Sequence, residues 1–191
     1  MERRENQRVM LTKRMLLDAL VDMLENKEIG EISVTELCRH AGVNRTTFYK
    51  HYSTPNDILT ELAQRHVNGL AELYRTRTGS VVDQVEAGCA YLHRNADEVC
   101  LLMRSRMDEI IPKAVFQELI QLIPVQPMFS ANLDAVECTL VLTYIANGCY
   151  FLIRKWLMED VQKTPREIAQ LIFQLSTRGW LPAVFNENKK V

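Results

Sequence analysis

The residues best suited to chemistry lie between positions 38 and 59, where the sequence reads CRHAGVNRTTFYKHYSTPNDIL. This stretch holds Arg39, Arg45 and Lys50, and it contains no acidic residue before Asp57. The whole chain has a net charge of −1, so its composition gives no general attraction to nucleic acid or membranes. Local cations without acids suit contacts with phosphate, and arginine also pairs with base edges. The stretch is a candidate nucleic-acid-binding segment, although a solvated helix in an ordinary bundle could carry a similar patch.

The sequence contains no constellation typical of an enzyme. It has no Ser/His/Asp order, no paired acids in an apolar setting, no cluster with metal-ligand spacing and no glycine-rich phosphate loop. Asp108 and Glu109 are adjacent, so on a helix their side chains would point about 100° apart and could not act as a close pair. We expect no enzymatic activity, no metal site and no other cofactor.

The five cysteines, at positions 38, 89, 100, 138 and 149, form no CxxC pair. An odd number without such a pair argues against a disulfide framework or a zinc site. We expect small apolar residues on buried helix faces, and a thiol redox sensor is the alternative. His66 and His93 are expected to be ordinary surface or packing residues.

Four helices are predicted in the first third of the chain. The first spans about 12–26, is capped by Thr12, and carries an apolar stripe at the helical period. The second begins at Ser33, which forms a capping box with Glu36, and ends near Gly42. Asn44 caps a third helix that ends near residues 50–51. Thr54 caps a fourth helix, and Pro55 takes its first position. The stripe of the first helix consists of Leu16, Ala19, Leu20, Met23 and Leu24.

The second and third of these helices, joined by a short turn containing glycine, make a helix-turn-helix unit. Phe48 and Tyr52 are four residues apart, so both can face inward. This turns Arg45, Thr46, Tyr49 and Lys50 outward, and a short helix of this kind without acids suits the DNA major groove. Residues 1–14 carry five cations and two acids, which predicts either a solvated tail or an arm that contacts DNA.

The remainder of the chain also reads as helical, with no convincing alternating strand pattern. We expect an all-α protein with an N-terminal helix-turn-helix domain (1–54), a connecting fourth helix (55–79) and a C-terminal regulatory and dimerisation domain (80–191). The start, MERRENQR, does not resemble a signal peptide, and the longest uncharged run, 138–153, is 16 residues long. A bilayer span needs roughly 20 residues, so we expect no membrane contact and a cytoplasmic protein. Helices of the C-terminal domain are predicted at 80–94, 96–107, 112–123, 132–158 and 164–177.

The segment ISVTELCRHAGVNRTTFYKHYSTPNDIL, at 32–59, resembles the DNA-binding region of TetR/AcrR transcriptional regulators. The likeness lies in the Ser33–Leu37 start, the Ala41–Val43 turn, the Thr47–Tyr49 core and the aromatic Tyr52 before the fourth helix. The likeness covers approximately residues 8–60. The resemblance implies that a homodimer binds palindromic double-stranded operator DNA. The residues that it places at bases or phosphates are Arg8, Val34, Thr35, Asn44, Arg45, Thr46, Thr47, Tyr49, Lys50, His51 and Thr54.

One position departs from the family pattern. The family commonly has a phosphate-contacting lysine where this chain has Pro55. Thr54 and the amides at the start of the helix could still hold a phosphate.

The family resemblance is looser after residue 80. There the chain most resembles TetR-family members with a short regulatory domain that carries a glycine followed eight residues later by a tryptophan, here Gly148 and Trp156. This resemblance implies a pocket for a small, largely apolar effector and a dimer surface on the last two helices. Asn147 is singled out because an amide inside an apolar helix needs a partner when buried. The expected effector residues are Tyr91, Met103, Met107, Phe116, Tyr144, Asn147 and Phe151. The expected dimer residues are Trp156, Ile168, Leu171, Ile172 and Leu175.

These expectations describe a homodimeric DNA-binding repressor that a small effector releases from DNA. The alternative from another class is a partner or coactivator protein with the same fold that acts through protein–protein contacts.

Overall fold

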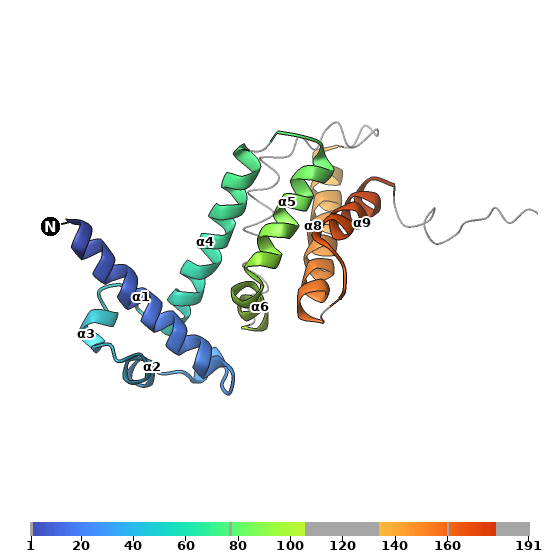
Figure 1. Cartoon of the computed structure of the whole chain (residues 1–191). Coiled ribbons are helices and arrows are strands. Elements are labelled where there is room, and N and C mark those ends of the chain that lie inside the picture. The colour runs from blue at the N-terminus through green and yellow to red at the C-terminus, as the bar shows by residue number, and fades with distance from the viewer. Residues whose placement is uncertain (1, 77, 106–133, 160, 179–191) are drawn as a thin grey trace, which may run out of the picture.

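A computed structural model of the chain describes residues 2–76, 78–105, 134–159 and 161–178. Within these ranges the secondary structure is entirely helical, as the sequence predicts. The helix predicted at 112–123 lies outside the described residues. Figure 1 shows an N-terminal group of helices joined by the long helix α4 to a C-terminal group. The elements are α1 (Glu2–Leu24), the 3₁₀ helix η1 (Ile29–Glu31), α2 (Val34–Ala41), α3 (Arg45–Phe48), α4 (Pro55–Thr76), α5 (Val81–Arg94), α6 (Ala96–Arg104), α8 (Ala135–Met158) and α9 (Pro165–Arg178).

Helix α1 begins ten residues before the predicted start, so the prediction that Thr12 caps it is wrong. Residues 2–11 contain good helix formers and neither glycine nor proline. Extending an existing helix costs little, whereas the apolar stripe reveals only the part that is buried. That stripe is inside: Leu16 and Leu20 are fully buried, and Ala19 and Met23 are nearly so.

The ends of α2 agree with the sequence, although only half of the predicted capping box forms. Ser33 Oγ accepts a hydrogen bond from the Glu36 amide at 3.2 Å. The Glu36 carboxylate instead accepts from Lys27 Nζ at 2.5 Å, which lowers the pKa of Glu36. Gly42 ends the helix with a φ of 66°, a left-handed conformation that glycine adopts without strain.

The start of α4 is stabilised by Asp57, a residue that the sequence analysis did not identify. Its carboxylate accepts from the Ser53 amide at 2.7 Å, the Thr54 amide at 3.0 Å and the Thr54 hydroxyl at 3.0 Å. These bonds lower the pKa of Asp57, the amide bonds contributing most. Thr54 therefore donates at this helix start, and Asp57 supplies the accepting group. Further along, α4 buries one face, which contains Ile58, Leu59, Leu62, His66 and Leu70.

The hydrophobic core of the N-terminal unit lies between α1, α2, α3 and the first half of α4. Leu37, Phe48 and Leu59 are fully buried there. Leu102 of α6 also belongs to this core, so the C-terminal group contacts it directly. The predicted division at residues 54/55 and 79/80 stays a prediction.

In the C-terminal group α5 packs most extensively against α9. Cys89, Trp156, Ile168 and Ile172 form one buried cluster, and Arg166 of α9 adds ion pairs with α5. A second cluster joins Val99 and Met103 of α6 to Tyr150 of α8. Helix α6 therefore touches the N-terminal core through one face and α8 through another.

Candidate nucleic-acid interface

Helix α3 is anchored by two aromatic residues and leaves its cations in solvent. The Phe48 side chain is fully buried, and Tyr52 is 6% exposed, as the four-residue spacing predicted. Their ring centroids lie 5.8 Å apart. Arg45, Thr46 and Lys50 are exposed, and so is Tyr49 at 53%. The buried pair thus fixes which side of the short helix faces outward.

The helix is shorter than predicted, because the α-helical conformation ends at Phe48 and not near residue 50. The next residues continue as a tight turn, with the Lys50 amide bonded to the Thr47 carbonyl at 3.3 Å and the His51 amide to the Phe48 carbonyl at 2.9 Å. Such bonds between residues three apart are common where a helix ends. The turn keeps Lys50 exposed, whereas Thr47 and His51 are half-buried.

Other expected contact residues lie on α1, at the start of α2 and in the turn before α3. Thr35 at the start of α2 is exposed, and Val34 beside it is half-buried. Asn44 is exposed, but its Oδ1 caps α3 by accepting from the Thr46 amide at 2.8 Å. Arg8 is exposed on the N-terminal half of α1.

The cations of this face have no acidic partner among the described residues. Arg39, Arg45 and Lys50 are all exposed, and none forms an ion pair with an acid in the part of the chain described. An unpaired exposed cation can release counterions from phosphate without first breaking an internal salt bridge. The electrostatics of this face therefore suit a polyanion.

The start of α4 is less suited to phosphate than the sequence suggested. Pro55 has no amide hydrogen, and the Ser53 and Thr54 amides already donate to the Asp57 carboxylate. A phosphate bound there would have to compete with that carboxylate. Both the amide and the hydroxyl of Thr54 are engaged by Asp57, and the contact of Thr54 with DNA stays a prediction.

The expected effector residues that the structure describes differ widely in exposure. Met103 is buried against Val99 and Tyr150, whereas Tyr144 is 74% exposed and Phe151 61% exposed. Asn147 is exposed in the single subunit and donates to the carbonyl of Thr143, in its own helix, at 2.8 Å, so the subunit's own core does not bury it. The helical period identified an apolar helix but not which of its sides would be covered. Met107 and Phe116 lie outside the described residues.

A cleft of about 570 Å³ lies elsewhere, between the end of α1, η1 and α6. Leu24, Ile29 and Leu101 contribute apolar walls, and Asp97 and Arg104 are among its polar residues. None of the five expected effector residues that the structure describes is among its lining residues.

The expected dimer residues also separate into two groups. Trp156, Ile168 and Ile172 are buried within the subunit, and this corrects their assignment to a dimer surface. Trp156 Nε1 donates to the Lys163 carbonyl at 2.9 Å, and its ring stacks on His93. Leu171 and Leu175 are 43% and 39% exposed. The apolar stripe of α9 fills the subunit's own core, which periodicity alone cannot distinguish from an interface.

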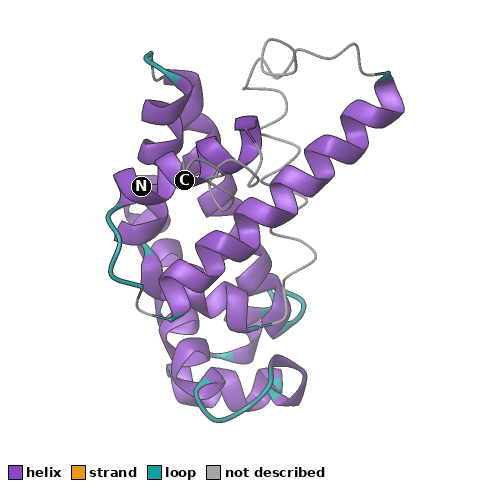
Figure 2. Ribbon diagram, turned by 90° about the vertical axis from the view of Figure 1, so that its right-hand side faces the viewer, coloured by secondary structure: helices purple, strands orange, loops and turns teal. Residues whose placement is uncertain are grey.

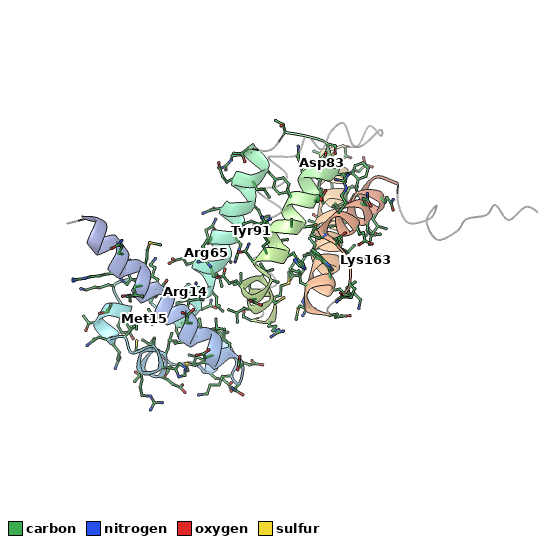
Figure 3. The ribbon with its side chains drawn as sticks, in the orientation of Figure 1. Arg14, Met15, Arg65, Asp83, Tyr91 and Lys163 are labelled. Atoms are coloured by element: carbon green, nitrogen blue, oxygen red, sulfur yellow. The ribbon has the colours of Figure 1, made fainter. Side chains whose placement is uncertain are left out.

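The sequence analysis did not predict a polar cluster that lies between α4, α5 and α6. His66 is 6% exposed and lies between Tyr91 and Glu98, and Arg65 also contacts Glu98. Figure 3 labels Arg65 on α4 and Tyr91 on α5 at this joint. The sequence feature that could have pointed to this cluster is His66, a titratable residue on the apolar face of the predicted fourth helix.

Four of the five cysteines lie in surroundings that disfavour the thiolate. Burial raises the pKa of Cys89 to about 12 and also raises the pKa values of Cys38, Cys100 and Cys149. A redox sensor needs an accessible thiolate, which a raised pKa opposes. Among the described residues no group of three or more His, Cys, Asp or Glu side chains could hold a metal ion.

Helix α8 is long and apolar enough to cross a membrane by length and composition alone. In Figure 2 it crosses the front of the molecule diagonally, and its first turns stand clear of the other described helices. Val136, Leu140, Tyr144 and Phe151 are its large exposed apolar residues. A single helix of this kind is weak support for a membrane protein, because a helix at a subunit interface has the same composition.

Comparisons with known proteins agree with this arrangement. Residues 81–178, slightly more than half of the chain, match the TetR family model described as the transcriptional regulator C-terminal region. The uncharacterized HTH-type transcriptional regulator YxbF of Bacillus subtilis is 24% identical over an alignment of 186 residues, which covers 91% of this chain and 48% of YxbF. The chain thus spans about half the length of that relative.

Two solved structures share the fold. The TetR transcriptional regulator of Streptococcus agalactiae superposes with a TM-score of 0.71 at 16% identity, covering 93% of this chain and 100% of that one. The fatty acid degradation regulator FadR of Bacillus halodurans gives 0.64 at 17% identity, covering 87% and 98%. TetR-family regulators bind DNA and small-molecule effectors, act as dimers and are not enzymes. With its family match and its helix-turn-helix, this chain belongs to the TetR family of DNA-binding transcriptional regulators.

Proposed function

We propose that two copies of this chain bind a near-palindromic duplex, each placing α3 in the major groove of one half-site. The exposed side of α3 carries this proposal. Arg45 and Lys50 are unpaired with acids among the described residues, and the buried Phe48 fixes their direction. Arginine pairs with guanine edges, lysine suits phosphate, and Thr46 and Tyr49 add hydrogen-bonding groups.

The dimer surface that we propose lies on the exposed side of α8 and the adjoining part of α9. Val136, Leu140 and Tyr144 follow each other at four-residue intervals, and Phe151 continues the same side. Leu171 and Leu175 add exposed apolar area on α9. Each Å² of apolar surface removed from water contributes roughly 25 cal/mol, so such a stripe favours burial against a partner. We therefore assign Tyr144 and Phe151 to the proposed subunit interface and no longer to the effector pocket.

We further propose that a small, largely apolar effector releases the protein from DNA, which makes it a repressor. Helix α4 supports this proposal because its start packs in the N-terminal core and its later turns pack on α5 and α6. A displacement between these helices would move α3 and change the distance between the two α3 helices of a dimer. Two of the expected effector residues lie on the helices that pack against α4: Tyr91 of α5, which contacts His66 of α4, and Met103 of α6, which packs against Tyr150.

Selection of bound duplexes from a random pool tests the DNA-binding proposal. The expected consensus is a near-palindrome whose half-sites are about one helical turn, or a multiple of it, apart. Arg45→Ala should lose about 1–3 kcal/mol of binding free energy and relax the preference at one position of each half-site. Arg94→Ala, which removes an exposed arginine at the end of α5, is the matched control. A pool without a consensus, or equal effects of the two substitutions, would contradict the proposal.

The start of α4 favours a second candidate, a partner or coactivator that does not read DNA itself. Pro55 replaces the family's common lysine, and Asp57 occupies the neighbouring amides. The same selection decides between the two, because a partner protein would enrich no duplex on its own.

A further inference from the structure

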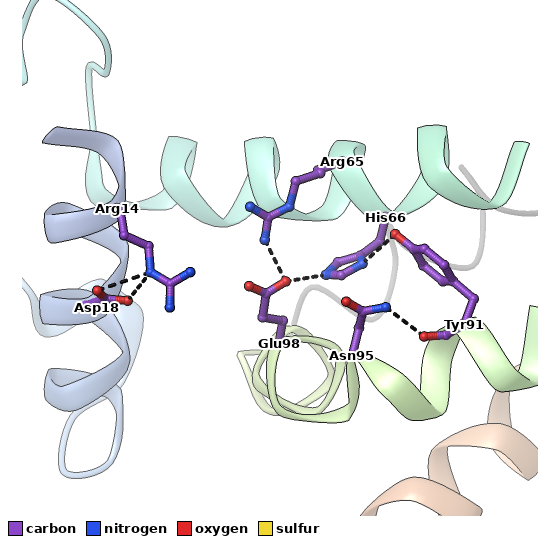
Figure 4. Close-up of polar contacts among 7 residues, drawn as sticks. All are labelled: Arg14, Asp18, Arg65, His66, Tyr91, Asn95 and Glu98. Atoms are coloured by element: carbon purple, nitrogen blue, oxygen red, sulfur yellow. Dashed lines mark hydrogen bonds and ion pairs between the residues drawn. The ribbon is translucent and has the colours of Figure 1, made fainter. Parts of the chain in front are cut away.

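A buried histidine joins α4 to both α5 and α6, in the cluster that Figure 4 shows. The Nδ1 atom of His66 lies 3.2 Å from the Tyr91 hydroxyl, and Nε2 lies 3.0 Å from Glu98 Oε2. Arg65 contacts the same Glu98 oxygen at 2.5 Å. Asn95 steadies α5 beside the cluster by donating to the Tyr91 carbonyl at 2.7 Å. Three helices therefore meet at one titratable side chain.

The contacts of His66 fit a neutral imidazole. A carboxylate only accepts hydrogen bonds, so the proton belongs on Nε2, facing Glu98, and Nδ1 accepts from the Tyr91 hydroxyl. The Nε2–Oε2 pair is close, but within the described part of the chain Nε2 has no well-aligned hydrogen-bond partner, so the negative charge of Glu98 attracts the ring without an ideal hydrogen bond. We infer the tautomer with the proton on Nε2 from the positions of Tyr91 and Glu98.

The charged groups around His66 come from all three helices. Arg65 of α4, Tyr91 of α5 and Glu98 of α6 face it. Burial lowers the pKa of His66, Arg65 lowers it further, and Glu98 opposes both. Glu98 already forms an ion pair with Arg65, so its negative charge would compensate the positive charge of a protonated His66 only in part. A second proton would therefore place a poorly compensated charge in a buried position.

The cluster has little room to adjust in place. The Tyr91 hydroxyl also lies against Gly69 of α4, so tightly that a Cβ there would be 2.4 Å away. Helices α4 and α5 consequently cannot approach each other to improve the contacts of a charged ring. A charged His66 side chain could gain better contacts only if α4 moved away from α5 or α6. Such a movement would reach α3, because the start of α4 belongs to the same core as Phe48. Leu102 of α6 lies in that core as well.

We propose that protonation of His66 loosens α4 from the α5–α6 corner, so that DNA binding weakens as the pH falls below about 6.5, the ordinary titration range of histidine. This inference rests on the proposed DNA-binding function. The direction of the effect follows from linkage. In the clamped conformation, with α4 packed on α5 and α6, protonation of His66 is disfavoured; in the loosened conformation, with α4 moved away, His66 accepts a proton more readily. If DNA selects the clamped conformation, DNA binding and protonation oppose each other reciprocally.

The test compares duplex affinity at pH 7.5 and 5.5, at constant salt, for the wild type and His66→Gln. The probe is the duplex obtained by selection, and fluorescence anisotropy reports its dissociation constant. A one-unit difference in the pKa of His66 between free and bound protein corresponds to about tenfold in affinity per subunit. We expect the wild type to lose up to about this much more than His66→Gln on acidification. The other three histidines are present in both proteins, so the difference isolates His66.

His93→Gln is the matched control, because His93 stacks on Trp156 away from this cluster and should leave the wild-type pH response intact. Tyr91→Phe is a second variant that removes the hydroxyl but keeps the ring, and it should change the pH response without removing the histidine. Equal pH responses of the wild type and His66→Gln would overturn the proposal.

A measurement without DNA separates this inference from the proposed function. The His66 Cε1 proton signal, assigned by its loss in His66→Gln, follows its titration in the free protein by NMR. Amide hydrogen exchange of α4 should accelerate as that signal titrates. Exchange that is unchanged through the titration would overturn the inference even if a duplex is bound. Acceleration in a protein that binds no duplex would support the clamp and reject only the DNA-binding proposal.

Discussion

The hydroxyl of Tyr91 on α5 lies directly over the Cα of Gly69 on α4. A Cβ built on Gly69 would be 2.4 Å from that hydroxyl oxygen. The reciprocal contact is present one step along the interface, where Tyr74 of α4 lies over Gly88 of α5 at the same distance. Two tyrosines thus fill the spaces that two missing side chains leave. This pairing fixes the separation of α4 and α5 and keeps the Tyr91 hydroxyl within reach of His66.

Gly69→Ala should lower the stability of the protein. Alanine within a helix normally gains about 1 kcal/mol over glycine. Here the added methyl would displace the Tyr91 hydroxyl, and such overpacking costs about 1–3 kcal/mol. Urea unfolding followed by circular dichroism measures the balance. The loss should shrink in a Tyr91→Leu background, and a Gly69→Ala protein more stable than the wild type would contradict the contact.

Acid should weaken the joint between α5 and α9. The Ser80 hydroxyl, followed by Arg166, lowers the pKa of Asp83 to about 2. A carboxylate with a lowered pKa stabilises the fold above its ordinary pKa of 3.8, and this contribution disappears as the pH falls toward 2. Urea midpoints of Asp83→Asn should therefore change less than those of the wild type between pH 5 and 2. Asp97→Asn, at an exposed carboxylate, should retain the wild-type profile.

Substitutions at two neighbouring positions of α9 should have different consequences. Leu171 is exposed, so Leu171→Glu should leave the subunit folded and convert the proposed dimer into monomers. Ile168 is 4% exposed, so Ile168→Glu would bury an unpaired charge and should unfold the C-terminal group. Light scattering and thermal unfolding distinguish the two outcomes. A wild type that is monomeric at micromolar concentration would argue against this surface.

Lys50→Ala should weaken binding to all duplexes about equally. If Lys50 contacts phosphate, its removal also reduces the dependence of log affinity on log salt by about one per contact. Titrations from low to moderate salt against selected and scrambled duplexes measure both effects. A change confined to the selected duplex would instead place Lys50 at a base.

The sequence by itself determined the local structure of the DNA-reading unit. Ser33, Gly42 and Asn44 act at the helix ends where they were predicted, because caps and left-handed turns depend on neighbours in the chain. Phe48 and Tyr52 turned inward as their spacing required. The all-α fold and the TetR family also followed from the sequence, since period and motif are both read along the chain.

Tertiary structure alone decided which apolar side is covered and which polar groups meet. Periodicity marks Ile168, Leu171 and Ile172 equally, but only packing against α5 and α8 shows that Leu171 remains exposed. Likewise, His66 and Glu98 are far apart in sequence and adjacent in space. Burial depends on the elements that pack against a helix, and one helix cannot specify those through its own pattern.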